Sequence, residues 1–386
     1  MIGYIRHIVF DCIRLLYQVF TNERVRNNLL RFLHSKNKKP YSLIWHEVTS
    51  LRKYWGYIPS QYYTHDFYSV DCDLTLEEMK KYIPSYYFYK ILFPQYDDLK
   101  FASKLVENKI DMNLLFIQIG LANSAVLFVK SDLNFKNLNS QFLMEEDIKK
   151  ILDTAACRKI FIKPVTGRGG NGIIIAKRIG SEFYYNGKRI DYEYCINLKG
   201  DYVFESEIIQ HNYLNKIYCK SVNTLRAITI RHDNGNVELV AAILRIGVAG
   251  REIDNCCAGG LLIGIDVNTG SCVKSFATFS FGNQQVKRHP DSGFDFSSLK
   301  IPNWEHIRNE ILLSADKLTQ LNLVGWDIAI TENGISIIEV NTIFGIDGLQ
   351  SGIGGIRDLF IDGEPKPFSK MYNFKGKEYE SKNFSY

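Results

Sequence analysis

The sequence predicts a mixed α+β protein, and three stretches carry that prediction. From Lys159 onward the chain reads as short apolar strands separated by glycine turns. Residues 303–320 have the spacing of an amphipathic helix, and residues 325–341 (GWDIAITENGISIIEVN) read as a hairpin. With 386 residues, of which 46% are hydrophobic and 23% charged, the chain can bury a large core, so a disordered chain is excluded.

The first 20 residues predict an amphipathic helix, because apolar residues recur at helical spacing between charged ones. Residues 1–40 hold eight Lys or Arg against Asp11 and Glu23, whereas the rest of the chain is nearly neutral. The charges rule out a lone bilayer-spanning helix, and no signal-peptide cleavage site follows. Two interpretations stay open: the helix lies on an anionic membrane surface, or it packs on its own domain.

The next segments predict helices and then strands. Residues 41–95 are rich in Tyr and Trp and read as helical pieces, with a helix expected over 74–83. Another helix is expected over 98–109, and 114–120 and 124–130 read as short strands. Eight cysteines without a C-x-x-C pair predict reduced thiols and a cytoplasmic protein rather than a disulfide framework or a zinc cluster.

The stretch KPVTGRGGNGIIIAKR (163–178) contains a G-x-G-x-x-G spacing. A dinucleotide site needs a helix after the glycines, but a β-branched run follows here. A P-loop ends in Gly-Lys-Ser or Gly-Lys-Thr, and neither follows Gly172. The kinase tripeptides H-R-D and D-F-G do not occur in the chain. A strand, a glycine flap and a second strand remain, with Lys163 aimed at a nucleotide's phosphates and glycine amides closing over them. The alternative is a tight hairpin without a ligand.

The hairpin at 325–341 predicts a magnesium site. Glu339 and Asn341 are two residues apart, so they share one face of a strand, and both offer oxygen ligands. A three-residue loop, Glu332-Asn333-Gly334 with a left-handed Gly334, would pair Asp327 with Glu339. In that register Ile328, Ile330, Ile338 and Val340 share the opposite, apolar face. The alternative is a hairpin whose polar residues simply face water.

Several stretches together resemble the ATP-grasp superfamily, and in particular its sugar-transfer associated family. They are FIKPVTGRGGNGI, FESEIIQH, SVNTLRAITIR, LRIGVAG, IDNCCAGGLLIGID, HPDSG, IPNW and GWDIAITENGISIIEVN, in order from about residue 160 to 342. The resemblance implies an ATP-grasp fold of two α+β subdomains gripping ATP, over 96–215 and 216–386. A mainly helical region, 1–95, precedes them.

The resemblance also implies roles for single residues. Lys163 and Lys100 would neutralise phosphates, Asp327, Glu339 and Asn341 would hold Mg²⁺, and Arg226 and Arg245 would meet the γ phosphate or the acyl group. The flap would be Gly167, Arg168, Gly169, Gly170, Asn171 and Gly172; the adenine and ribose hinge would include Glu205, Glu207, Ile208 and His211; the acceptor loop would include Asp254, Asn255, Gly259 and Gly260. Many ATP-grasp ligases have an arginine where this chain has Gly325.

The resemblance implies a ligase that uses ATP and Mg²⁺ to join a carboxylate to an amine through an acyl phosphate. One substrate would be a sugar or glycan precursor of a capsule or other surface polysaccharide, and the other a small amino or carboxylic acid. The basic N-terminus is compatible with a lipid-linked acceptor at the inner membrane face. Two alternatives stay open: an ATP-dependent sugar phosphotransferase and a non-catalytic nucleotide-gated module. Nucleic acid is not expected as a partner, because no basic stripe is evident.

Overall fold

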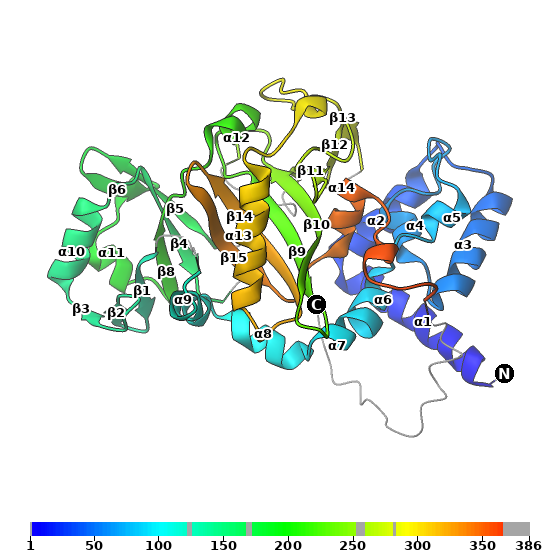
Figure 1. Cartoon of the computed structure of the whole chain (residues 1–386), viewed down its shortest axis with the longest axis horizontal. Helices are drawn as coiled ribbons and strands as arrows, with labels where there is room; N and C mark the ends of the chain where they lie inside the picture. The colour runs from blue at the N-terminus through cyan, green and yellow to red at the C-terminus, as the bar shows by residue number, and fades with distance from the viewer. Residues whose placement is uncertain (1, 122–125, 167–171, 252–258, 281–282, 366–386) are drawn as a thin grey trace. The chain divides into compact units, whose positions relative to one another are not determined.

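The protein is described from a computed structural model. It describes residues 2–121, 126–166, 172–251, 259–280 and 283–365. These residues form two compact units, each described by itself (Figure 1). The first contains residues 2–95, 283–284 and 345–365, and the second contains residues 96–280 and 285–344.

The first unit is helical in its described part. Its helices are α1 (Ile2–Thr21), α2 (Glu23–His34), α3 (Tyr41–Trp55), α4 (Ser60–Thr64), α5 (Leu76–Met79), α6 (Ser85–Tyr87), the π-helical turn Phe88–Leu92, α7 (Phe93–Tyr96) at its end, α14 (Ile346–Ile353) and the 3-10 turn Arg357–Leu359. The predicted N-terminal helix is confirmed, whereas the helix expected over 74–83 is shortened to α5. No helix in the described ranges is long and apolar enough to cross a membrane.

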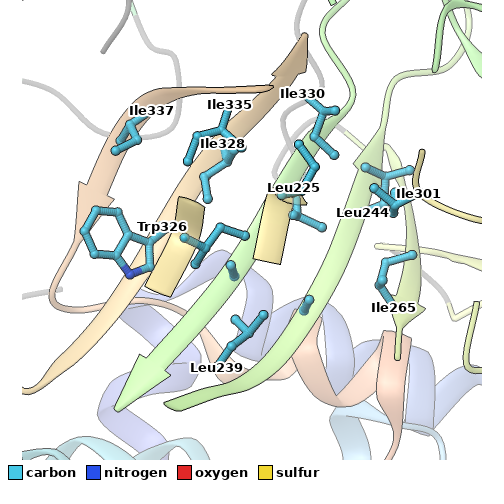
Figure 2. Close-up of a cluster of buried hydrophobic side chains, with 14 of the residues drawn as sticks. Leu225, Leu239, Leu244, Ile265, Ile301, Trp326, Ile328, Ile330, Ile335 and Ile337 are labelled. Atoms are coloured by element: carbon cyan, nitrogen blue, oxygen red, sulfur yellow. The ribbon is translucent and has the colours of Figure 1, made fainter. Parts of the chain in front are cut away.

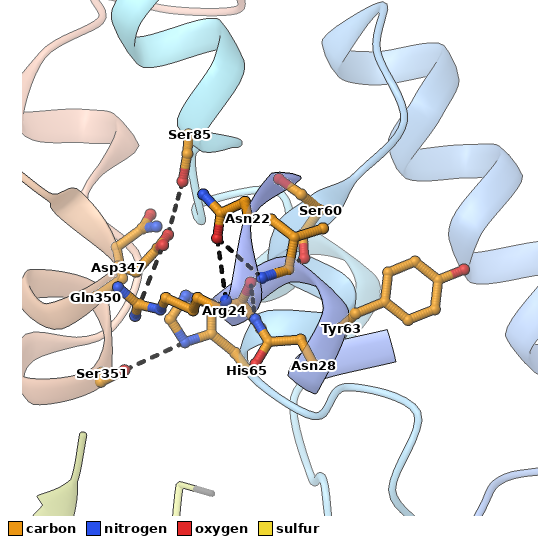
Figure 3. A network of polar contacts seen from close by, with 12 residues as sticks. Asn22, Arg24, Asn28, Ser60, Tyr63, His65, Ser85, Asp347, Gln350 and Ser351 are labelled. Carbon is orange, nitrogen blue, oxygen red and sulfur yellow. Dashed lines mark hydrogen bonds and ion pairs between the residues drawn. The ribbon is translucent and has the colours of Figure 1, made fainter. Parts of the chain in front are cut away.

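Polar contacts tie α14 to segments far earlier in the chain (Figure 3). Ser85 Oγ donates to Asp347 Oδ1 at 2.8 Å, and the Arg24 guanidinium lies 3.7 Å from Asp347 Oδ2. The buried Gln350 side chain exchanges two hydrogen bonds with the backbone of Ile83, at 2.6 and 3.1 Å. A buried amide that satisfies a backbone N–H and C=O fixes its helix in place. Residues 345–365, which the sequence analysis assigns to the C-terminal subdomain, therefore pack within the first unit.

Within its described residues, the second unit contains two antiparallel sheets. The eight-stranded sheet has the order β3 (Phe142–Leu143), β2 (Asn134–Lys136), β1 (Val126–Ser131), β8 (Tyr202–Ser206), β4 (Lys159–Pro164), β5 (Ile174–Ile179), β6 (Glu182–Tyr185) and β7 (Lys188–Arg189). The seven-stranded sheet has the order β13 (Gln285–Val286), β12 (Ala277–Phe279), β11 (Leu261–Ile265), β10 (Val237–Ile246), β9 (Thr224–Arg231), β14 (Leu323–Thr331) and β15 (Gly334–Asn341). The pairing of β4 with β5 confirms the two strands predicted on either side of the glycines, whereas residues 167–171 between them lie outside the described part.

Six helical segments complete the second unit's described elements. They are α8 (Leu99–Glu107), α9 (Lys109–Gln118), α10 (Glu145–Thr154), α11 (Tyr192–Ile196), α12 (Asn212–Ile217) and α13 (Trp304–Lys317), with a 3-10 turn at Phe296–Ser298. The predicted amphipathic helix is confirmed as α13, which lies across the seven-stranded sheet (Figure 1). Its buried side chains join the largest apolar cluster with Leu225, Leu244, Trp326 and Ile328 (Figure 2). One face of this sheet is thus covered by core.

The expected strand over 114–120 is wrong, because most of this segment belongs to helix α9. The Asn108 side chain accepts hydrogen bonds from the backbone N–H groups of Ile110 and Asp111, at 2.9 and 3.2 Å, and so starts the helix. Met112 and Phe116, four residues apart, are buried as in a helix. A short apolar run does not distinguish a strand from a buried helix, and here the cap decides.

The predicted pairing of Asp327 with Glu339 is confirmed, but the loop that produces it is not the expected one. Thr331 pairs with Gly334, which leaves a two-residue loop, and a β-bulge between Asp327 and Ile328 restores the pairing. Gly334 has a φ of +121° rather than the αL value. The bulge also changes the apolar face: Ile337 is buried with Ile328, whereas Ile338 is not part of that core cluster.

Candidate active site

Five polar side chains lie on the face of the seven-stranded sheet opposite the core. Arg226 of β9 pairs across the sheet with Asp327 of β14, which in turn pairs with Glu339 of β15. Arg245 of β10 lies two residues from the partner of Arg226, and Asn341 lies two residues from Glu339. Because strand side chains alternate, all five share one face. The sheet therefore brings together these predicted metal and catalytic residues.

Asp327 is the centre of this group. Arg226 Nε and Nη2 donate to its two carboxylate oxygens at 2.5 and 2.9 Å, and Arg245 Nη2 lies 3.1 Å from Oδ2. Asn341 Nδ2 donates to the same oxygen at 3.3 Å. Burial by itself would raise the pKa of Asp327, but Arg226 and Arg245 outweigh burial and the pKa is lowered. Asp327 is therefore an ionised carboxylate that already accepts several hydrogen bonds.

Glu339 has the opposite electrostatic situation. Burial raises the pKa of its carboxyl group, and the neighbouring Asp327 charge raises it further; Lys109, Arg226 and Lys163 act against this rise. Among the described residues, no hydrogen bond to the Glu339 carboxylate is formed. Two carboxylates side by side in a buried place are stabilised by a cation. Glu339 is the side chain of this face whose charge is least compensated by its surroundings.

A second polar group comes from the eight-stranded sheet. On β4, Lys163 is two residues after Phe161, which pairs with Glu205 of the neighbouring strand β8. The Nζ atom of Lys163 lies 2.5 Å from Glu205 Oε2. Lys109 lies at the first turn of α9, and burial lowers the pKa of its ammonium group. The positive charge of Lys163 also lowers this pKa, whereas the carboxylates of Glu339 and Glu205 raise it. Lys109 is therefore within electrostatic reach of Glu339, Lys163 and Glu205, and Lys163 is within reach of Glu339.

A lysine that sequence reasoning did not name, Lys109, lies near the charged residues of this group. Lys100 lies exposed on the first turn of α8, whereas Lys109 acts on both Glu339 and Lys163. The sequence signal that could have found it is Asn108, a cap that ends α8 and opens α9 with Lys109 as its first residue. The helix expected over 98–109 put Lys109 at the end of one helix, whereas it is the first residue of the next one, α9.

The predicted hinge leads from β8 to α12. Glu207 accepts a hydrogen bond from the backbone N–H of Arg158 at 2.5 Å, and Ile208 is half-buried. His211 donates its backbone N–H to Ile330 at 2.8 Å, and its ring Nε2 lies 3.2 Å from Glu332 Oε2. The hinge is thus attached to β14 and to the turn between β14 and β15. Glu205, in contrast, forms an ion pair with Lys163, so it does not share the contacts of Glu207 and His211.

A buried amide pair that sequence reasoning missed holds the hinge in shape. Gln210 donates to the carbonyls of Tyr218 and Ser221 at 2.9 and 3.0 Å, and its Oε1 accepts from both nitrogens of Asn223. Both side chains are buried. Within the pair, Gln210 Oε1 and both amide nitrogens are hydrogen-bonded, whereas the buried Asn223 Oδ1 has no partner among the described residues, and these bonds rigidify the loop.

Several predicted residues lie outside the described part of the chain. They are Gly167, Arg168, Gly169, Gly170 and Asn171 of the flap, and Asp254 and Asn255 of the acceptor loop. At the described ends, Gly172 has a φ of +75°, and a Cβ there would lie 3.2 Å from Pro164 Cγ. Gly259 has a φ of +86°, and the buried Gly260 precedes β11, the neighbour of the strand that carries Arg245. Positive φ values at both glycines favour this residue type.

The absence of an arginine at position 325 has a structural reason. A Cβ at Gly325 would lie 2.7 Å from Cδ1 and 3.0 Å from Cγ of Phe344. Phe344 is only 1% exposed, so its ring cannot move aside without opening the core. The space beside Asp327 on this strand is filled by an aromatic ring, and Arg226 and Arg245 supply the positive charge from the neighbouring strands.

The donor set fits a hard cation. No group of three or more His, Cys, Asp or Glu that could bind a metal occurs among the described residues. Glu339 offers a carboxylate, and Asn341, which donates its nitrogen to Asp327, keeps its Oδ1 available as a ligand. All-oxygen ligands of this kind suit Mg²⁺ and do not suit zinc.

Residues 90–355 match one protein family, described as sugar-transfer associated ATP-grasp. The chain belongs to this family. The predicted family and the predicted ATP-grasp fold are thereby confirmed. The match begins near the end of the N-terminal helical segment and ends just after α14, so residues 1–89 and 356–386 lie outside it.

Solved structures give distant likenesses. The chain is similar to an ADP complex of N5-carboxyaminoimidazole ribonucleotide synthetase (12% identity, 62% of this chain and 45% of that chain, TM-score 0.36). It is also similar to D-alanyl-alanine synthetase A from Vibrio cholerae (13%, 70% and 64%, 0.38) and to biotin carboxylase from Campylobacter jejuni (13%, 67% and 46%, 0.39). Each match spans less than two thirds of the solved chain. No curated protein matches the sequence.

Proposed function

We propose that the chain is an ATP-dependent carboxylate–amine ligase that acts through an acyl phosphate. The observation that carries the proposal is the convergence of Arg226, Arg245, Asp327 and Glu339 on one sheet face with Lys109 and Lys163 in electrostatic reach. These charges suit a triphosphate and a transferring phosphoryl group. Phosphoryl transfer requires alignment and charge neutralisation more than a protein nucleophile.

In the proposed reaction, a carboxylate oxygen of the first substrate attacks the γ phosphorus of ATP, and ADP leaves. The amine of the second substrate then attacks the acyl carbon, inorganic phosphate leaves, and the nitrogen loses a proton. Lys163 and Lys109 would neutralise the ATP phosphates. Lys163 must then exchange its contact with Glu205 for one with a phosphate, so ATP binding competes with that ion pair.

Arg226 and Arg245 can bind either Asp327 or a group of the substrates. In the resting protein both guanidinium groups neutralise Asp327. An arginine fork binds a phosphoryl or carboxylate group in the same planar geometry. We expect one of the two to turn from Asp327 toward the γ phosphate or the acyl phosphate when substrates bind, which would leave an Asp327 oxygen for a metal ion.

Glu339 and Asn341, with Asp327, would hold Mg²⁺. When bound, the ion would neutralise phosphate oxygens during transfer. The raised pKa of Glu339 supports this assignment, because a cation replaces the proton that burial favours. The glycine flap would cover the phosphates and keep water from the acyl phosphate.

We further propose that one substrate is a sugar or glycan precursor of a surface polysaccharide, such as a capsule. The family's association with sugar transfer supports this class. An amide between a uronic acid and an amino acid, or between an amino sugar and an acyl group, fits the chemistry. Whether the reaction takes place at a membrane depends on a separate feature, the N-terminal helix.

The test is an ADP-release screen that combines sugar acids with amino acids, followed by mass measurement of the product. A ligase releases ADP and phosphate and yields a product heavier by the amine minus water, and hydroxylamine traps its acyl phosphate. Glu339→Gln should remove this activity. Glu238→Gln, an exposed carboxylate on β10 that pairs with His232, is the matched control and should keep it.

Two other results would contradict the proposal. A stable phosphorylated sugar, formed without consumption of the amine, would show a phosphotransferase. ATP binding without ADP release, in every combination of the screen, would show a nucleotide-gated module.

A further inference from the structure

Helix α1 presents an apolar face outward. Its exposed apolar side chains are Phe10, Ile13, Leu16, Tyr17 and Phe20, each between 56% and 79% exposed. Four of them recur at i, i+3, i+7 and i+10, which places them along one side of a helix. We call these five residues the apolar face of α1. An apolar stripe of this length on the outside of a helix is unusual for a surface in water.

The opposite side of α1 is polar and faces its own unit. Asp11 is fully buried and accepts the backbone N–H of Ile58 at 2.6 Å. Arg14 donates to Asp11 and, at 3.1 Å, to Gln18 Oε1, and its guanidinium lies 4.0 Å from the ring centroid of Tyr86. Asp11, Arg14 and Gln18 are spaced i, i+3 and i+7. The helix is therefore anchored by its polar side, and turning it over would break these contacts.

Basic residues follow the apolar face along the chain. Of the two acids in residues 1–40, Asp11 is buried and paired with Arg14, whereas eight Lys or Arg occur in the same range. Arg24, Arg26 and Lys36, which follow α1, are exposed, and of these Arg24 also lies 3.7 Å from Asp347. Anionic lipid headgroups attract such clusters, and each basic group close to the surface adds to binding.

We propose that the apolar face of α1 docks onto an anionic lipid membrane surface. The helix lies in the plane of the interface, its apolar face enters the boundary of headgroups and acyl chains, and the basic residues contact the headgroups. A second copy of this chain is a poorer occupant, because it would bring two clusters of positive charge together. A neutral apolar groove on another protein is also a poorer partner, because it would not attract the basic residues that follow α1.

The experiment measures how much of the full chain sediments with lipid vesicles. One set of vesicles contains phosphatidylcholine alone, and the other contains about one third phosphatidylserine. We expect binding to the anionic vesicles, little to the neutral ones, and weakening as salt rises. The double variant Phe10→Ser, Phe20→Ser should bind about a hundredfold more weakly, since each buried ring contributes about a factor of ten. Leu313→Ser, a residue exposed to 63% on α13, is the matched control and should bind like the parent.

Both variants replace exposed side chains, and circular dichroism checks that they stay folded. Three results would overturn the proposal: no binding of the parent to anionic vesicles, equal binding of the double variant and the parent, or a parent dimer in analytical ultracentrifugation that the double variant lacks. The last result would identify the apolar face as a self-association surface.

Discussion

Replacing Asp327 by Asn tests the charge cluster at the centre of the site. Asn has nearly the same shape, so no cavity forms, and the change removes one negative charge from between Arg226 and Arg245. Asp327 is 4% exposed, and the side chains of the two arginines are 12% and 16% exposed. Two like charges would then be left partly buried without their common partner.

The size of the effect follows from the contacts. The carboxylate accepts two hydrogen bonds from Arg226 and one from Arg245, and a hydrogen bond to a charged group contributes about 1.5–3 kcal/mol. Part of that is offset, because the variant no longer buries a carboxylate beside Glu339. Breaking a buried ion pair by removing one partner destabilises a protein by about 3–5 kcal/mol, and we expect a loss in that range.

Hydrogen exchange in increasing urea, read on peptides from β9 and β14, measures the opening free energy of this sheet. Asp316→Asn is the control: Asp316 also pairs with an arginine, Arg231, at 3.5 Å, but its side chain is 70% exposed. That variant should stay within about 0.5 kcal/mol of the parent. If Asp327→Asn lowered the opening free energy by less than about 1 kcal/mol, Asp327 would not hold the two arginines in the resting protein.

Three further predictions concern neighbouring positions. Gly325→Ala should destabilise the sheet by about 1–3 kcal/mol, because its Cβ would overlap the Phe344 ring; additive effects of Gly325→Ala and Phe344→Ala in the same exchange assay would contradict this. Burial and Asp327 raise the pKa of Glu339, so the free energy of unfolding should decline as pH rises above about 4.3, the pKa of a glutamate in the unfolded chain. In urea unfolding, Glu339→Gln should lack that decline. Parallel pH curves of the variant and the parent would refute this prediction. Lys109→Met should weaken ATP binding about tenfold or more in calorimetry, whereas Lys100→Met, an exposed position, should not; equal effects would assign the wrong lysine.

The parts of the site that sequence reasoning predicted are those governed by alternation along a strand. Glu339 and Asn341 share a face because they are two residues apart, and β4 and β5 follow from β-branched runs on either side of the glycines. The pairing of Asp327 with Glu339 was predicted from a loop that the protein does not use. A bulge gives the same pairing, and nothing in the alternation of residues 334–341 announces where an extra residue is inserted.

Other features depend on groups that come together from distant parts of the chain. Lys109 acts on Glu339, 230 positions later, only because α9 and β15 fold into the same unit. Gly325 excludes the expected arginine because of Phe344, whose position is a matter of packing. Neither effect has a local signature.

The sequence by itself determined the family, the strands around the glycine flap, and the pair of carboxylates on the hairpin, since these depend on residue type and short spacing. The tertiary structure alone decided which lysine approaches Glu339, how Asp327 is shared between two arginines, and which side of α1 faces outward. The physical reason is that amphipathic spacing defines two faces of a helix but not their direction. In α1 the buried partner of Asp11 is the backbone of Ile58, and that contact turns the apolar face to the outside.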